Sequence, residues 1–238
     1  HVSIVCNFTK PTATKPSLLT FSEVTTLFHE FGHALHGMLA NTTYPSLSGT
    51  NVAWDFVELP SQIMENWCYE KEALALFAKH YETGDRIPMD LIDKIKSAST
   101  FQQGMQTLRQ LSFGLLDMSW HGTDPSKITN IKKQEKEAFK QTQLFPDVKQ
   151  NCMSTAFSHI FQGGYSSGYY SYKWAEVLDA DAFEYFKQNS LFDPKVASDF
   201  KEHILSKGGT GDPLELYINF RGQKPKADAL LRRSGLVS

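Results

Sequence analysis

The first residues of the chain alternate between apolar and polar side chains. Val2, Ile4, Cys6 and Phe8 occupy every second position, with polar Ser3 and Asn7 between them. An apolar period of two residues predicts a β-strand with one buried face. We therefore expect residues 1–8 to form one strand of a small β-sheet.

Most of the remaining chain has apolar residues at helical spacing. Thr20 followed by Glu23 is a capping-box sequence, so the first helix should begin there and run to about Asn41. Pro60 must lie in the first turn of the next helix or kink it. Helices are predicted at about residues 56–83, 89–119, 124–144, 173–189, 194–207, 213–220 and 225–234. The class is therefore mainly α with a small β-sheet.

Composition excludes several kinds of partner. The chain has 238 residues, a formal net charge of -2 and three widely spaced cysteines. It has no basic bias for nucleic acid and no apolar run long enough to span a membrane. The few cysteines favour a reducing compartment, and we expect the cytoplasm. Because His1 is neither an initiator methionine nor the start of a signal peptide, we expect the sequence to come from the interior of a longer polypeptide.

The sequence His29-Glu30-Phe31-Gly32-His33 carries the strongest chemical signal. Histidines four residues apart on a helix project from one face and can bind one Zn²⁺. Glu30 lies between them, where a carboxylate can accept a proton from water without binding the metal. Apolar neighbours such as Phe31 predict that this helix is buried. A glycine inside a helix also costs about 1 kcal/mol, so Gly32 indicates close packing.

A catalytic zinc site needs a third protein ligand. His36 follows His33 by three residues, which is not the spacing of the metzincins. Glu58 begins the next predicted helix and could complete a site of two histidines and one glutamate. Its carboxylate could equally stabilise that helix N-terminus, and spacing alone does not decide between these roles. The sequence also leaves open whether Asp55 or Glu65 orients a ligand histidine.

Three blocks of sequence resemble the M3 family of zinc peptidases, the thimet oligopeptidase and neurolysin group. The blocks are Phe28–His36, Asp55–Gln62 and Phe157–Trp174. They occur in the right order and span essentially the whole chain. The details are most similar to the bacterial branch of peptidyl-dipeptidase Dcp and oligopeptidase A.

The resemblance implies a zincin-like (neurolysin-like) helical domain in which residues 1–238 are the C-terminal catalytic part. The N-terminal part of the same enzyme, absent here, would be a partner. One zinc ion would be bound by His29, His33 and Glu58, with Glu30 as the general base.

The resemblance also assigns roles to the third block. Tyr172 would stabilise the oxyanion with help from His159. Tyr165, Tyr169, Gly163 and Gly164 would bind substrate, with Gly168 helping the loop to close.

The predicted function is hydrolysis of short peptides, with release of C-terminal dipeptides. The alternatives are internal cleavage, as in oligopeptidase A, and a non-catalytic fragment in which zinc only stabilises a peptide-binding fold. Glu30 argues against the last of these, because a structural site needs no general base. No partner beyond short peptides and the missing N-terminal part is expected.

Overall fold

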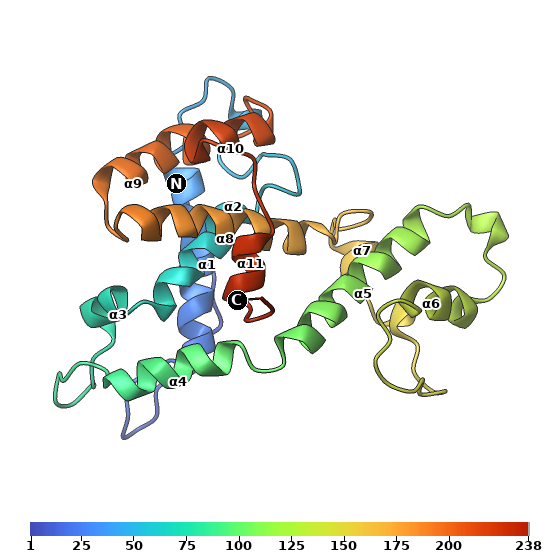
Figure 1. Cartoon of the computed structure of the whole chain (residues 1–238), viewed down its shortest axis with the longest axis horizontal. Helices are drawn as coiled ribbons and strands as arrows, with labels where there is room; N and C mark the ends of the chain where they lie inside the picture. Colours follow the sequence, from blue (N-terminus) through green and yellow to red (C-terminus); the bar gives the residue numbers. More distant parts are fainter. Residues whose placement is uncertain (238) are drawn as a thin grey trace. The chain divides into compact units, whose positions relative to one another are not determined.

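The computed structural model describes residues 1–237, which fall into two compact units (Figure 1). The first unit contains residues 1–101 and 175–237, and the second contains residues 102–174. The chain is mainly helical, as the sequence predicts.

The predicted β-sheet is not present among residues 1–237. The only β-pairing in this range is an isolated antiparallel bridge between Lys79 and Arg86. Residues 1–8 form no regular element. Ile4, Cys6 and Phe8 are half-buried as the alternation indicates, but Val2 is exposed. The segment has no partner strand within the described range, and a strand without a partner forms no ladder.

Helix α1 (Phe21–Met38) begins as predicted. The Thr20 hydroxyl accepts a hydrogen bond from the Glu23 amide at 3.2 Å, and the Glu23 carboxylate accepts one from the Thr20 amide at 2.7 Å. Both halves of the capping box are therefore formed. The helix ends at Met38, three residues before the predicted end near Asn41.

The predicted helix at 56–83 is three shorter elements. They are α2 (Leu59–Glu65), the 3₁₀ turn η2 (Asn66–Tyr69) and α3 (Lys71–Phe77). The Asn66 side chain donates to the carbonyls of Gln62 and Ile63, which tightens the chain where α2 ends. Pro60 does lie in the first turn of α2.

The predicted helix at 89–119 is also divided. Helix α4 (Met89–Ser99) ends before α5 (Gln103–His121) begins, and Gln102 between them has a left-handed φ of 55°. The Ser99 and Thr100 hydroxyls bond back to the carbonyls of Lys96 and Ser97, and such bonds compete with helix propagation. The apolar period of the sequence does not report this interruption.

The core of the first unit is formed by α2 and the C-terminal helices. These are α8 (Ser171–Asn189, which crosses the boundary between the units), α9 (Pro194–Phe200), the π-helical η5 (Lys201–Leu205), α10 (Pro213–Arg221) and α11 (Asp228–Arg233). Asp193 and Asp212 cap α9 and α10, as their Asp-Pro sequences indicate. Leu59 and Ile63 of α2 pack with Leu178 and Phe183 of α8 in one apolar cluster. Because α2 is anchored in this cluster, its N-terminus has a fixed position.

The second unit is built around α5, with the short helices α6 (Ile131–Phe139) and α7 (His159–Gln162). The predicted helix at 124–144 begins later, since Asn130 caps α6 through the Lys133 amide at 2.9 Å. Phe113 and Leu116 of α5 pack with Phe157, Ile160 and Tyr169. This apolar cluster supports the segment that connects α7 to α8.

Candidate metal centre

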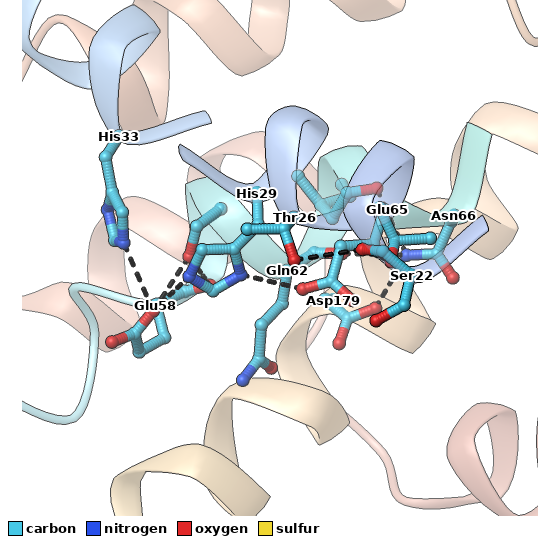
Figure 2. Close-up of polar contacts among 12 residues, drawn as sticks. Ser22, Thr26, His29, His33, Glu58, Gln62, Glu65, Asn66 and Asp179 are labelled. Atoms are coloured by element: carbon cyan, nitrogen blue, oxygen red, sulfur yellow. Dashed lines mark hydrogen bonds and ion pairs between the residues drawn. The ribbon is translucent and has the colours of Figure 1, made fainter. Parts of the chain in front are cut away.

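His29 and His33 project from one face of α1, one turn apart. Their ring centroids are 5.1 Å apart and the ring planes are nearly perpendicular. Each side chain is about a quarter exposed. Figure 2 shows both rings directed at Glu58. The helical spacing of the sequence thus brings the two imidazoles together as predicted.

Glu58 is the N-cap residue of α2 and is almost completely buried. Its Oε2 atom lies 3.4 Å from Nε2 of His29 and 3.3 Å from Nε2 of His33. Ser61 fixes the carboxylate, since its hydroxyl lies 2.8 Å from the same oxygen. The Glu58 carboxylate therefore lies within reach of both imidazoles, which is the position that a third metal ligand requires.

Gly32 allows Glu58 to approach the histidines. A Cβ atom on Gly32 would lie 2.2 Å from the Pro60 carbonyl oxygen and 2.5 Å from the Ser61 Cα atom. Helices α1 and α2 therefore touch backbone to backbone at a residue that lies between the two histidines in sequence, directly before His33. The close packing that Gly32 predicts is confirmed.

The charges at this centre are strongly coupled. Burial lowers the pKa of His29, but hydrogen bonds to Glu58 and Glu65 outweigh it and raise the pKa to about 10. Burial raises the pKa of Glu58, but hydrogen bonds from His29, His33 and Ser61 bring it well below the usual range. The cluster thus favours an ionised Glu58 carboxylate and a positive charge on the His29 side of it.

The three side chains fit a zinc ion. Their ligand atoms all lie within 4.8 Å of one another. Ligand atoms about 2.0–2.2 Å from a tetrahedral zinc ion are about 3.3–3.5 Å apart, which matches both histidine-to-glutamate distances. Two imidazoles and one carboxylate are also the donor set of catalytic zinc sites with two histidines and one glutamate.

Glu65 orients the first histidine. Its Oε1 atom lies 2.7 Å from Nδ1 of His29 (Figure 2). Because a carboxylate accepts, Nδ1 carries the proton and Nε2 is left to bind a metal. Between Asp55 and Glu65, which the sequence left open, the structure supports Glu65. For His33, Nδ1 is buried and has no hydrogen-bond partner among residues 1–237.

The rest of the helix differs from the sequence expectation in one respect. Phe31 is 44% exposed, and Glu30 is half-buried, so α1 buries only one side. The prediction of a buried helix was wrong for Phe31, because the apolar residues of α1 do not all lie on the side that packs against α2.

His36 is fully buried, and neither ring nitrogen has a hydrogen-bond partner within the described range. Its position supports a packing role.

The aromatic residues predicted from the third block lie together in the second unit. The rings of Tyr165 and Tyr172 are stacked, with centroids 4.9 Å apart. Tyr169 lies 5.2 Å from Tyr172, and His159 lies 5.6 Å from Tyr165. We call these four residues the aromatic cluster.

The members of the aromatic cluster differ in exposure. His159 is exposed, Tyr165 and Tyr172 are half-buried, and Tyr169 is buried against Phe113 and Phe157. Burial raises the pKa of Tyr169. Nearby, Gly163 ends α7, and its Cβ position would meet the His159 carbonyl at 3.0 Å. Gly164 has a left-handed φ of 82°, so both glycines have a structural reason in this turn.

Sequence reasoning missed Ser61. The signal was present, since Ser61 follows Glu58 by three residues at a helix N-terminus, where such side chains face each other. Its hydroxyl also lies 2.9 Å from the Glu58 carbonyl, so it holds the Glu58 backbone as well as the carboxylate.

A mainly helical chain with two histidines and a glutamate around one point, and a further glutamate between the histidines, has the features of a metallopeptidase. The model of peptidase family M3 matches residues 1–236. The chain therefore belongs to peptidase family M3.

Named relatives are similar over almost the whole chain. Oligopeptidase A of Haemophilus influenzae is 46% identical over 237 residues, which is 99% of this chain and 35% of that protein. The probable cytosolic oligopeptidase A of Arabidopsis thaliana is 45% identical over 99% of this chain and 34% of its own length. The dipeptidyl carboxypeptidase of Escherichia coli is 40% identical over 98% of this chain and 34% of its own length. The chain thus spans about a third of the length of these relatives.

Two further findings concern membrane-spanning helices and the state of the cysteines. Among residues 1–237, no helix has the length and apolar character needed to cross a membrane. Cys6, Cys68 and Cys152 are free thiols.

Proposed function

We propose that this chain is the catalytic part of a zinc peptidase that hydrolyses short peptides. The observation that carries the proposal is the convergence of His29, His33 and Glu58, with Glu30 on the same helix. One zinc ion per chain is expected. The M3 family supports this, and it also supports a zincin-like (neurolysin-like) assignment for the fold.

In this proposal, zinc supplies a positive charge that acidifies a water molecule and polarises the peptide carbonyl. His29, His33 and Glu58 hold the ion, and Glu65 holds His29 in the tautomer that can bind it. Glu30 accepts the proton from the attacking water and delivers it to the leaving amine. These steps need a carboxylate that does not itself bind the metal, and Glu30 is outside the cluster of ligand atoms.

In the proposed reaction, the aromatic cluster stabilises the oxyanion and binds the substrate. Tyr172 donates a hydrogen bond to the oxyanion that forms from the peptide carbonyl, with His159 assisting. Tyr165, Tyr169, Gly163 and Gly164 bind the substrate backbone. This part of the proposal rests on membership of the M3 family and on the grouping of the four aromatic residues within the second unit.

For the mode of cleavage we favour internal cuts in short peptides. The identity to oligopeptidase A is 46%, against 40% for dipeptidyl carboxypeptidase. This departs from the release of C-terminal dipeptides that the sequence led us to expect. Dipeptide release is the second candidate, since 40% identity over 98% of the chain is also high.

The proposal extends to the setting of the enzyme. Because this chain spans about a third of the length of its relatives, we propose that it acts with a further, N-terminal part of the same polypeptide. A cytoplasmic location is supported by the name of the Arabidopsis relative and by the three free thiols.

Glu30→Gln in the full-length polypeptide tests the function. The variant should bind one zinc ion and lose nearly all turnover, because an amide does not accept the proton. Product masses from one peptide of about ten residues then separate internal cuts from stepwise loss of C-terminal dipeptides. A zinc-loaded variant with near-normal turnover would contradict the role of Glu30. Wild-type protein that binds zinc but cleaves no peptide would leave only a non-catalytic zinc site.

A further inference from the structure

Asp117 is a buried carboxylate that contacts the segment carrying the tyrosines of the aromatic cluster. It lies in the last turn but one of α5 and has no exposed surface. Nothing in the metal centre or in the proposed reaction uses it. A buried charge of this kind is costly unless hydrogen-bond donors surround it, so its donors show what it does.

Two of the donors are backbone amides from the segment that carries the tyrosines. The Ser167 amide donates to Oδ1 at 2.9 Å, and the Tyr169 amide donates to Oδ2 at 2.9 Å. A carboxylate thus holds two backbone positions between Tyr165 and Tyr172. These contacts are 50 and 52 residues apart in sequence, so they are a tertiary link and not part of the helix.

The third donor is His121, one turn further along α5. Its Nδ1 lies 2.7 Å from Asp117 Oδ1 and 3.0 Å from the Asp117 carbonyl oxygen. Both partners accept, so Nδ1 must carry the proton. The Asp117 carboxylate therefore accepts hydrogen bonds from three donors.

The backbone between Tyr165 and Tyr172 bends sharply, and the hydrogen bonds to Asp117 stabilise this bend. Ser167 has a left-handed φ of 58°, which is uncommon for a residue other than glycine. The next amide, that of Gly168, bonds to the Tyr165 carbonyl at 2.9 Å and closes the turn. The turn therefore presents the Ser167 and Tyr169 amides to one carboxylate.

The ring of Tyr169 is fixed as firmly as its amide. It packs against Phe157 at 5.0 Å and Phe113 at 5.8 Å, and it is 9% exposed. Tyr165 and Tyr172, which stack on each other, are on either side of it in sequence and are less buried. Tyr169 thus connects the anchored backbone to the more accessible phenols.

We propose that Asp117 is a positioning residue for the peptidase reaction, acting through the Ser167 and Tyr169 amides to fix the phenols of Tyr165 and Tyr172. The inference rests on the proposed function of the aromatic cluster. An oxyanion donor is effective only when it is already aimed at the developing charge, and small displacements of catalytic groups can lower rates by roughly 10²-fold. Asp117 holds the backbone between the two phenols at two amides.

Asp117→Asn in the full-length enzyme tests the proposal. Asparagine has nearly the same shape, but it offers one acceptor oxygen where three donors converge, so at least one donor must face an NH₂ group. We expect turnover to fall by roughly 10²-fold, with a smaller change in the Michaelis constant and unchanged zinc content. Hydrogen exchange at the Ser167 and Tyr169 amides should become faster.

Glu135→Gln is the matched control. Glu135 is also a buried carboxylate of the second unit, and it accepts from the amides of Met153 at 3.0 Å and Ser154 at 2.7 Å. That segment carries no member of the aromatic cluster. The control should lose stability but keep its turnover. Equal loss of turnover in the two variants, in proportion to lost stability, would reduce Asp117 to a structural residue and overturn the proposal.

Two further readouts keep the test decisive. If Asp117→Asn does not fold, Asp117→Glu keeps the charge but moves both accepting oxygens by one methylene group away from the Ser167 and Tyr169 amides, and turnover should still fall severalfold. Unchanged turnover in that variant would also overturn the proposal. If the wild-type enzyme cleaves no peptide, the proposed function fails, whereas unchanged exchange at Ser167 and Tyr169 in Asp117→Asn refutes the anchoring itself.

Discussion

Gly32 of α1 lies directly against the backbone of Pro60 in α2. A Cβ atom at residue 32 would be 2.2 Å from the Pro60 carbonyl oxygen, which is far inside van der Waals contact. The two helices supply all three side chains of the candidate metal centre. The distance between their backbones therefore sets the distance between the histidines and Glu58.

Gly32→Ala should destabilise the protein by about 1–3 kcal/mol and weaken zinc binding. The added methyl group meets backbone atoms of Pro60 and Ser61, which cannot rotate away, so α1 and α2 must separate. Denaturant unfolding and a zinc competition titration measure the two effects.

Gly37→Ala provides the control in the same helix. A Cβ atom there would be 3.1 Å from a methyl group of Val2, which is exposed and can move. Alanine also favours a helix over glycine by about 1 kcal/mol, so this variant should be as stable as the wild type or more stable. If both variants unfold and bind zinc alike, the close approach at Gly32 does not determine the site.

Glu65→Gln should weaken zinc binding by roughly 10–100-fold without removing a ligand. The carboxylate accepts from Nδ1 of His29 at 2.7 Å, and this contact orients the ring and makes its other nitrogen a better donor to the metal. The zinc dissociation constant should be compared with that of Glu72→Gln. Glu72 is exposed in the first turn of α3, so the control removes the same charge away from the histidines. Identical zinc affinity in the two variants would show that the contact with His29 has no role in binding.

The features that sequence alone predicted are mostly local. The capping box at Thr20, the caps at Asp193 and Asp212 and the pair of His29 and His33 involve residues within four positions of each other. Short-range spacing determines such contacts, so they can be read without a structure. The same spacing also predicted helices that are too long, because it is insensitive to side chains such as Asn66 that bond back to the backbone.

Contacts between distant residues could not be predicted in this way. Spacing alone did not choose a role for Glu58, and it did not decide between Asp55 and Glu65, since both questions depend on how α2 packs on α1. Asp117 was not recognised at all, because its partners lie 50 and 52 residues away. A weak signal existed in Asp117 and His121, which are four residues apart on one helix.

Glu23→Gln should make the stability of the first unit less dependent on pH. Amides of Thr20 and Thr9, with the Thr9 hydroxyl, hold the pKa of Glu23 at about 2, below its usual value of 4.5. The ionised carboxylate therefore stabilises the folded state above pH 4.5, and this contribution is lost as the pH falls toward 2. Wild type should melt at a higher temperature than Glu23→Gln at pH 6, and the difference should shrink steadily below pH 4.5. A difference that stays constant down to pH 3 would show that the charge of Glu23 does not contribute.

Tyr172→Phe, made in the full-length enzyme, should lower turnover by roughly 10²–10³-fold while changing the Michaelis constant much less. Attack by water places negative charge on the former carbonyl oxygen, and a phenol aimed at that atom binds it more strongly than it binds the carbonyl of the substrate. Phenylalanine keeps the ring that stacks on Tyr165 at 4.9 Å, so the aromatic cluster should persist.

Tyr165→Phe is the matched variant, because it removes the other phenol of the stacked pair. If Tyr165 mainly binds the substrate backbone, its loss should raise the Michaelis constant more than it lowers turnover. Steady-state kinetics on both variants, each checked for zinc content, distinguishes the two roles. A Tyr172→Phe enzyme with normal turnover and only a raised Michaelis constant would make Tyr172 a binding residue. The oxyanion would then need another donor, and the exposed His159 of the same cluster is the next side chain to substitute.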